Sequence, residues 1–120
     1  MRRPHKAPLS VTELSDLNLS PPEFPGGNTA MFDFLRKNVK YPRACIENKI
    51  GGTIYASFVI DPFGNIKDVG ILNPMKGREL LEIEVIRVIT SMPEWRTGEL
   101  KTRGISVRFG IPVRFELAGL

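Results

Sequence analysis

Side chains able to perform covalent or metal chemistry are few and scattered in this sequence. The single histidine, His5, and the single cysteine, Cys45, lie far apart, which predicts neither a His/Cys zinc site nor a Cys–His nucleophile. Glu79, Glu82 and Glu84 cluster at the start of a predicted helix, where carboxylates interact favourably with the helix dipole. The glycine pairs in "PGGN" and "IGG" lack the Lys-Ser/Thr of a phosphate loop. We therefore expect no enzyme, no metal and no cofactor.

The last predicted strand indicates a site that could bind a partner through its backbone, not a catalytic site. In "ISVRFGIPVRFEL", residues 105–117, every odd position is apolar, the pattern of a half-buried strand. Pro112 interrupts it, and a strand proline is confined to edges, strand starts and bulges. In an antiparallel ladder each residue directs both backbone groups to one side, and the side alternates. Ser106, Arg108 and Gly110 are therefore expected to share an open edge with Pro112.

That edge has two interpretations. Proline and charge protect a sheet from edge-to-edge aggregation, and Pro112, Arg108 and Arg114 fit that role. An open edge also accepts an extended peptide as an added strand, whose main-chain hydrogen bonds supply much of the affinity. Two such edges could also pair with each other in a homodimer. The residues alone leave these alternatives open.

The elements expected to support the edge are two short helices, a hairpin and a long helix. The first short helix starts at Asn28, and the second has Pro42 at its first position. The hairpin follows with its turn at "DPFGN", and a change of apolar parity after the turn predicts a bulge near Lys67 and Asp68. The long helix ends at Pro93. Its apolar stripe comprises Leu81, Val85, Val88, Ile89 and Met92, broadened by Leu80, Ile83 and Ile86.

Together these elements predict an α+β fold with a three-stranded antiparallel sheet and helices packed on one face. The chain of 120 residues, 42% of them hydrophobic, suits one domain. Its many prolines mark residues 1–21 as a flexible lead-in or linker and residues 22–120 as the folded domain. "TGELKTRG" is predicted to be a polar loop, and Trp95 is expected to fold back onto the helix and sheet.

The charge does not indicate a nucleic-acid partner. The formal net charge is +4, but Arg2, Arg3 and Lys6 precede every acidic residue and account for three of these charges. The folded part is therefore nearly neutral, without the concentrated basic face of a phosphate-binding domain. We expect no nucleic acid among the partners.

Four segments, in order and spacing, resemble the C-terminal domain of TonB in Bacteroidetes-type sequences. They are "PEFPGG", "KYPRACIENKIGGTIYASFVIDPFGNIKDVGIL", "SMPEWRTGE" and "VRFGIPVRFEL". The resemblance extends from Pro22 to Leu117 and implies a strand order of second, first, third. It also implies a periplasmic domain of an energy transducer, whose last strand captures the TonB box of an outer-membrane transporter. An ExbB–ExbD-type proton channel would drive the other end of the protein.

The resemblance also implies the partner-binding residues. The box-pairing strand corresponds to Gly104, Ile105, Ser106, Val107, Arg108, Phe109 and Gly110, and a second contact region corresponds to Asn38, Val39, Lys40 and Tyr41. Arg108 could attract acidic residues beside the box or simply be solvated. The Tyr41 ring could instead pack over the second helix. Cys45 is expected to be buried and inert, and Lys49 replaces a frequent helix-ending glycine.

Three further alternatives concern the whole chain. The membrane helix and proline-rich spacer of the family are not recognisable in residues 1–20, so the chain is either an excised domain or a stand-alone relative. A periplasmic sensing or scaffolding module would use the same fold for another task. An acylphosphatase-like enzyme is the catalytic alternative, but the phosphate-binding loop after its first strand has no counterpart here.

Overall fold

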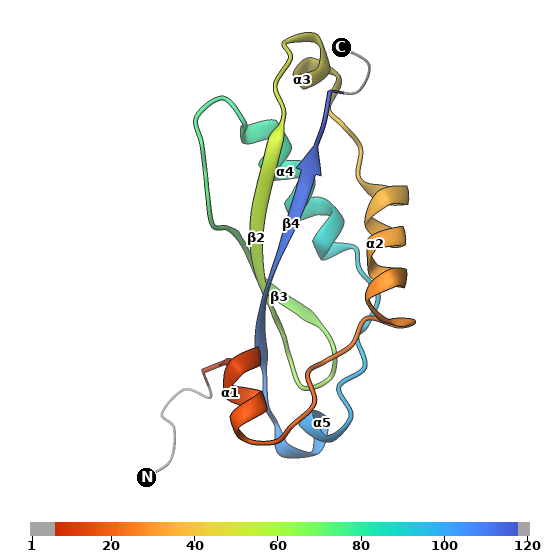
Figure 1. The fold of residues 1–120 in the computed structure, drawn as a ribbon, viewed down its shortest axis with the longest axis vertical. Helices are drawn as coiled ribbons and strands as arrows, with labels where there is room; N and C mark the ends of the chain where they lie inside the picture. Colours follow the sequence, from red (N-terminus) through yellow and green to blue (C-terminus); the bar gives the residue numbers. More distant parts are fainter. Residues whose placement is uncertain (1–6, 118–120) are drawn as a thin grey trace.

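The computed structural model describes residues 7–117, so His5, Arg2, Arg3 and Lys6 lie outside the described residues. Figure 1 shows a twisted sheet with helices beside and behind it. The elements in chain order are β1 (Leu9–Ser10), α1 (Val11–Asp16), α2 (Gly27–Asn38), α3 (Arg43–Glu47), β2 (Gly52–Ile60), β3 (Ile66–Ile71), α4 (Glu79–Thr90), α5 (Glu99–Arg103) and β4 (Val107–Phe115). None of these helices is long and apolar enough to cross a bilayer.

The sheet has four strands in the order β1-β4-β2-β3. β2 pairs antiparallel with β3 and with β4, and the β2–β4 register runs without a shift from Gly52↔Phe115 to Ile60↔Val107. β1 pairs parallel with β4. The α+β class and the placement of the last strand beside the first hairpin strand are therefore confirmed. The prediction of a three-stranded, purely antiparallel sheet is wrong, because the N-terminal segment adds a parallel strand.

Residues 9–19 contain a strand and a helix and contribute to a second, small core, so this part of residues 1–21 is not the irregular lead-in that was expected. α1 begins with a capping box, in which the Ser10 hydroxyl accepts from the Glu13 N–H and the Glu13 carboxylate accepts from the Ser10 N–H. Such reciprocal capping lets a short helix start despite the nearby prolines. The second core cluster consists of Leu9, Leu14, Leu19, Leu100 and Val107.

The main core lies between one face of the sheet and helices α2 and α4. Alternate residues of β2 point into it, namely Ile54, Ala56, Phe58 and Ile60, each fully buried. The predicted stripe on α4 is buried, but Leu80, Ile83 and Ile86 are exposed, so the expected broadening of that stripe is wrong. α4 packs on β2 and β3 with one side only, which leaves its outer side in solvent.

The connections follow the predicted chemistry with one exception. The register between β2 and β3 shifts between Ser57 and Val59, and Asp68 adopts a positive φ of 52°, which confirms the bulge. Trp95 is buried against Phe58, as expected. The segment expected to be a polar loop contains α5, because Leu100 is buried in the second core cluster and holds that turn in place.

Candidate functional site

The outer edge of β4 is the edge on the side away from β2, and Pro112 faces it. Pro112 lies directly opposite Tyr55 in the β2–β4 register. Tyr55 turns both backbone groups toward the β3 side, where its N–H donates to Asn73 Oδ1 (2.8 Å) and its carbonyl accepts from the Leu72 N–H (2.7 Å). In an antiparallel ladder, opposite residues either bond each other or both turn away. Pro112 therefore turns away from β2, as predicted.

The chain covers part of this edge itself. The Leu9 N–H of β1 donates to the Ser106 carbonyl (2.9 Å), and the parallel register pairs Leu9 with Val107 and Ser10 with Arg108. The expectation that Ser106 and Arg108 present unpaired backbone groups is therefore wrong. The prolines before Leu9 favoured an irregular segment, whereas burial of Leu9 beside Val107 holds the strand on the edge.

Beyond Arg108 the outer edge of β4 stays open and borders an apolar groove. The groove holds a cavity of about 480 Å³ between α2 and the second half of β4. Its apolar lining comprises Phe32, Leu35, Val39, Tyr41, Pro112, Val113 and Phe115. A second cavity of about 310 Å³ continues toward Gly110 and shares Phe32 and Pro112 with the first. Figure 1 shows α2 running beside this half of β4.

The charges at the rim of the groove are paired within the chain. Arg114 bonds Glu116 (2.9 Å) and Arg36 bonds Asp33, and all four side chains are exposed. Exposed ion pairs contribute little to stability. The groove is therefore apolar inside and nearly neutral at its rim.

The seven residues of the predicted box-pairing strand differ in how much of them a partner could reach. Gly104 ends α5 with a positive φ of 65°, and Ile105 packs against the second core cluster. Val107 is fully buried, while Arg108 and Gly110 are exposed. Phe109 stacks on Phe58 at a centroid distance of 6.1 Å. The even-numbered residues of β4 in this segment turn their backbone groups to the outer edge, the Arg108 side chain is exposed, and the half-buried Phe109 side chain lines the second cavity.

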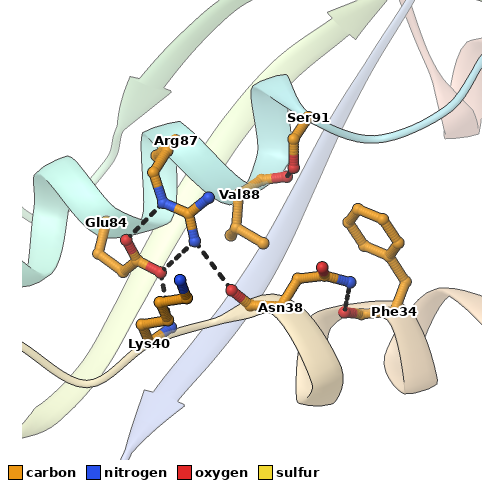
Figure 2. A network of polar contacts seen from close by, with 7 residues as sticks. All are labelled: Phe34, Asn38, Lys40, Glu84, Arg87, Val88 and Ser91. Atoms are coloured by element: carbon orange, nitrogen blue, oxygen red, sulfur yellow. Dashed lines mark hydrogen bonds and ion pairs between the residues drawn. The ribbon is translucent and has the colours of Figure 1, made fainter.

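The second predicted contact region is held by α4 through a polar network, which Figure 2 shows. The Lys40 N–H donates to Glu84 Oε2 (2.6 Å), and Arg87 Nη2 donates to the Asn38 carbonyl (2.8 Å). Arg87 also binds Glu84 with two donors, each at 2.7 Å. The network fixes the backbone between α2 and α3. It leaves Val39 and Tyr41 free to line the groove.

Tyr41 ties this region to the end of β4. Its hydroxyl donates to the Ile50 carbonyl (2.6 Å), and its ring meets Phe115 edge-on at a centroid distance of 5.3 Å. Burial raises the pKa of the Tyr41 hydroxyl, with a smaller contribution from Cys45. The structure thus brings residues 39–41 to residues 112–116, at the end of β4 and just after it, and not to the predicted segment 104–110.

Glu84 gives the network a dependence on pH. Hydrogen bonds from Arg87 lower the pKa of this carboxyl below its ordinary 4.5, against the opposing effect of burial and with further help from the Lys40 N–H. A lowered folded-state pKa adds stability above the unfolded-state value and loses it as the pH falls through the folded-state value. The network therefore stabilises the fold at neutral pH and weakens in acid.

We expect Glu84→Gln to lower the free energy of unfolding by about 2 kcal/mol at pH 7, because charge-assisted hydrogen bonds are lost. Below the ordinary pKa of 4.5 the difference from wild type should shrink. Urea denaturation across this pH range measures it. Glu47→Gln, on an exposed residue of α3, is the matched control and should change little. If Glu84→Gln lowered the free energy of unfolding equally at every pH, the role assigned to the Glu84 carboxylate would be contradicted.

Two other features bear on chemistry, namely the Cys45 thiol and any cluster of side chains that could bind a metal ion. Cys45 is a free thiol that is 1% exposed, which confirms its predicted burial. Within residues 7–117 no group of His, Cys, Asp and Glu side chains is arranged to hold a metal ion. The candidate surface for binding a partner is the outer edge of β4 together with the groove beside it.

Comparisons with known proteins agree with this arrangement. The family model described as Gram-negative bacterial TonB protein C-terminal matches residues 37–117, more than half of the chain. The solution structure of the Helicobacter pylori TonB C-terminal domain is similar, with a TM-score of 0.52 and 19% sequence identity over 75% of this chain and 92% of that one. No curated protein sequence matches. At this identity the structural likeness concerns the fold.

Proposed function

This chain belongs to the Gram-negative bacterial TonB C-terminal family, and from that premise we propose that it captures the N-terminal TonB box of an outer-membrane transporter as an added strand. Domains of this family are not enzymes; they belong to energy transducers, are typically periplasmic and imply TonB-dependent transporters as partners. In the proposed function, the captured segment transmits force that originates at an ExbB–ExbD-type proton channel in the inner membrane. Active uptake follows from that force.

The observation that supports this function most is the open stretch of β4 beside an apolar groove. In the described part of the chain, no strand pairs with the outer side of Gly110, Pro112 or Arg114. Gly110 and Arg114 can each offer an N–H and a carbonyl there, and Pro112 offers a carbonyl. An added strand uses such groups for main-chain hydrogen bonds and alternate side chains for specificity. The groove lined by Phe32 and Val39 is placed to receive those side chains.

The predicted partner-binding residues enter this proposal with an extension. Residues 104–110 and 38–41 remain proposed contacts, and we add Pro112–Phe115 because the groove joins them to Val39 and Tyr41. The exposed Arg108 side chain is proposed to attract acidic residues that flank the box. Ile105 and Val107 enter the proposal as residues that hold the strand in place, since their side chains pack into the second core cluster and Val107 pairs with Ile60 of β2.

Two substitutions at Gly110 test strand addition. Gly110→Pro removes an outward N–H and places a ring at the open edge, while Pro112 demonstrates that this side tolerates proline. Gly110→Ala keeps the N–H, and its methyl group would meet the Ala56 carbonyl at an ordinary 3.5 Å. The probe is a synthetic peptide copied from the N-terminus of a TonB-dependent transporter, and titration calorimetry gives its Kd.

We expect Gly110→Pro to weaken peptide binding at least about tenfold, the equivalent of roughly 1.4 kcal/mol, because a main-chain hydrogen bond and access to the edge are lost. Gly110→Ala should bind as wild type does. Circular dichroism verifies that both variants fold. Equal affinity of the proline variant and wild type would exclude the outer edge of β4 as the binding strand.

A further inference from the structure

We propose that β1 is a self-strand, an internal occupant of the outer edge of β4 that a guest peptide displaces. The proposal rests on the proposed function, since the guest is the same transporter segment. β1 covers Ser106–Arg108, three of the seven residues 104–110 along which the guest is expected to pair. The domain would then exist in a closed form with β1 docked and an open form with the full edge exposed.

The attachment of β1 is small compared with that of the helix that follows it. β1 has two residues, and Leu9 alone carries its apolar contact with the second core cluster. α1 is fastened separately from β1 by Leu14, which is fully buried. Leu9 and Ser10 can therefore leave the edge while α1 stays docked through Leu14. Val11, the first residue of α1, is the junction between the two parts.

The open stretch next to β1 gives a guest a place to begin. Gly110, Pro112 and Arg114 lie on the same outer side of β4 as Arg108, because the side alternates along the strand and the β2–β4 register has no shift. Because β1 runs parallel to β4, a guest that pairs first at Arg114 and Gly110 and extends toward Arg108 replaces Ser10 first and Leu9 second. Each main-chain hydrogen bond lost by β1 is then replaced by one to the guest.

β1 and α1 also lie outside the residues that the family model matches, which start at residue 37. β4 lies inside the matched range. The self-strand thus lies outside the matched range, and it sits on the strand proposed to bind the partner. An element at that position is suited to regulate binding.

The contacts of β1 specify the guest that can replace it. Leu9 is 9% exposed and packs in the cluster with Leu14, Leu100 and Val107. A guest that takes its place must bury an aliphatic side chain there, or leave an apolar cavity. The expected partner is therefore an extended peptide with a branched aliphatic residue at the position of Leu9.

A reversible disulfide tests the displacement. Ser10 and Arg108 are partners in the parallel register, and neighbouring strands lie about 4.8 Å apart, which a disulfide can span. In the full chain carrying Ser10→Cys and Arg108→Cys, oxidation locks β1 onto β4. The probe is the transporter N-terminal peptide used above. The single variant Arg108→Cys under the same oxidant is the matched control, and the buried Cys45 stays unchanged.

We expect the oxidised double variant to bind the peptide at least about tenfold more weakly than the same variant after reduction, with no such difference for the control. In the reduced form, the Leu9 amide resonance should move to an unstructured position when the peptide saturates the protein. Equal binding of the oxidised and reduced forms would overturn the self-strand while the proposed function stands. If wild type and both forms fail to bind, the proposed function falls together with the self-strand.

A release variant adds an independent measurement. Leu9→Ser removes the apolar contact of β1 and should tighten peptide binding by up to about tenfold, as expected when the closed form is nine-tenths populated. Leu17→Ser, on an exposed leucine of the same segment, should leave the affinity unchanged. Unchanged or weaker binding by a folded Leu9→Ser variant would contradict displacement.

Discussion

Replacing Phe58 by alanine is expected to lower the free energy of unfolding by about 4 kcal/mol, the cost of removing a large aromatic side chain from a core. Phe58 is fully buried in the centre of β2. Its ring stacks on Phe109 of β4 at 6.1 Å and meets Trp95 edge-on at 5.8 Å. The substitution therefore opens a cavity beneath the strand that carries the proposed site. Urea denaturation followed by circular dichroism measures the loss.

Phe63→Ala is the matched control for Phe58→Ala. Phe63 is 59% exposed, and its ring has a long contact of 5.8 Å with the Lys101 ammonium. Its removal should cost less than about 1 kcal/mol, because little of its apolar surface is buried and a surface cation–π contact is weak. Similar losses at the two positions would contradict a core centred on Phe58.

Gly64→Ala is expected to lower the free energy of unfolding by about 3 kcal/mol, through backbone strain and a steric clash together. Gly64 has a φ of +91° in the turn between β2 and β3. A methyl group there would lie 2.1 Å from the Trp95 carbonyl oxygen. The turn and the Trp95 backbone are joined by a hydrogen bond from the Trp95 N–H to the Gly64 carbonyl (2.9 Å), so neither can move alone.

Gly77→Ala separates the two contributions at Gly64. Gly77 has a similar φ of +97°, but a methyl group there would meet no atom within 4 Å. It should cost about 1 kcal/mol, the backbone contribution alone. Thermal and urea denaturation of both variants give the difference. If Gly64→Ala cost no more than Gly77→Ala, the close approach of Trp95 to the turn would be disproved.

The orientation of the β4 edge could be predicted from the sequence because it depends on local rules. Alternation of apolar residues sets the two faces of a strand, and a proline without a donor selects the side that needs none. Pro112 has a defined place in the alternation and also lacks a donor, so it predicts which side of β4 is the open edge. The hydrogen bonds of Tyr55 agree with that orientation. The bulge at Asp68 was predictable for the same reason, because a change of apolar parity can be seen in one strand.

β1 could not be predicted by the same rules. A strand of two residues has no periodicity, and the prolines around it favour irregular structure. The one local signal was the capping box formed by Ser10 and Glu13, which marks the start of a helix. Its docking depends on burial of Leu9 and Leu14 against Val107 and Leu100, residues distant in the sequence. Long-range packing of this kind leaves no pattern in one segment.

The groove beside β4 was also beyond prediction from the sequence. Its walls come from α2, from the segment before α3 and from the end of β4, and their meeting depends on the tertiary fold. Glu84 and Arg87 are spaced as a helical ion pair, but their bonds to Lys40 and Asn38 join segments more than forty residues apart. For this reason only the resemblance predicted the second contact region, and nothing in the sequence predicted its position beside Phe115.

The most direct measurement of the central claim is the set of nuclear Overhauser contacts between the transporter peptide and the isotope-labelled domain. If the guest docks on the outer edge of β4, its backbone protons will contact the amides of Gly110 and Arg114. Its side chains will contact Phe32 and Val39 in the groove. Contacts confined to β3, at the opposite edge of the sheet, would contradict the account.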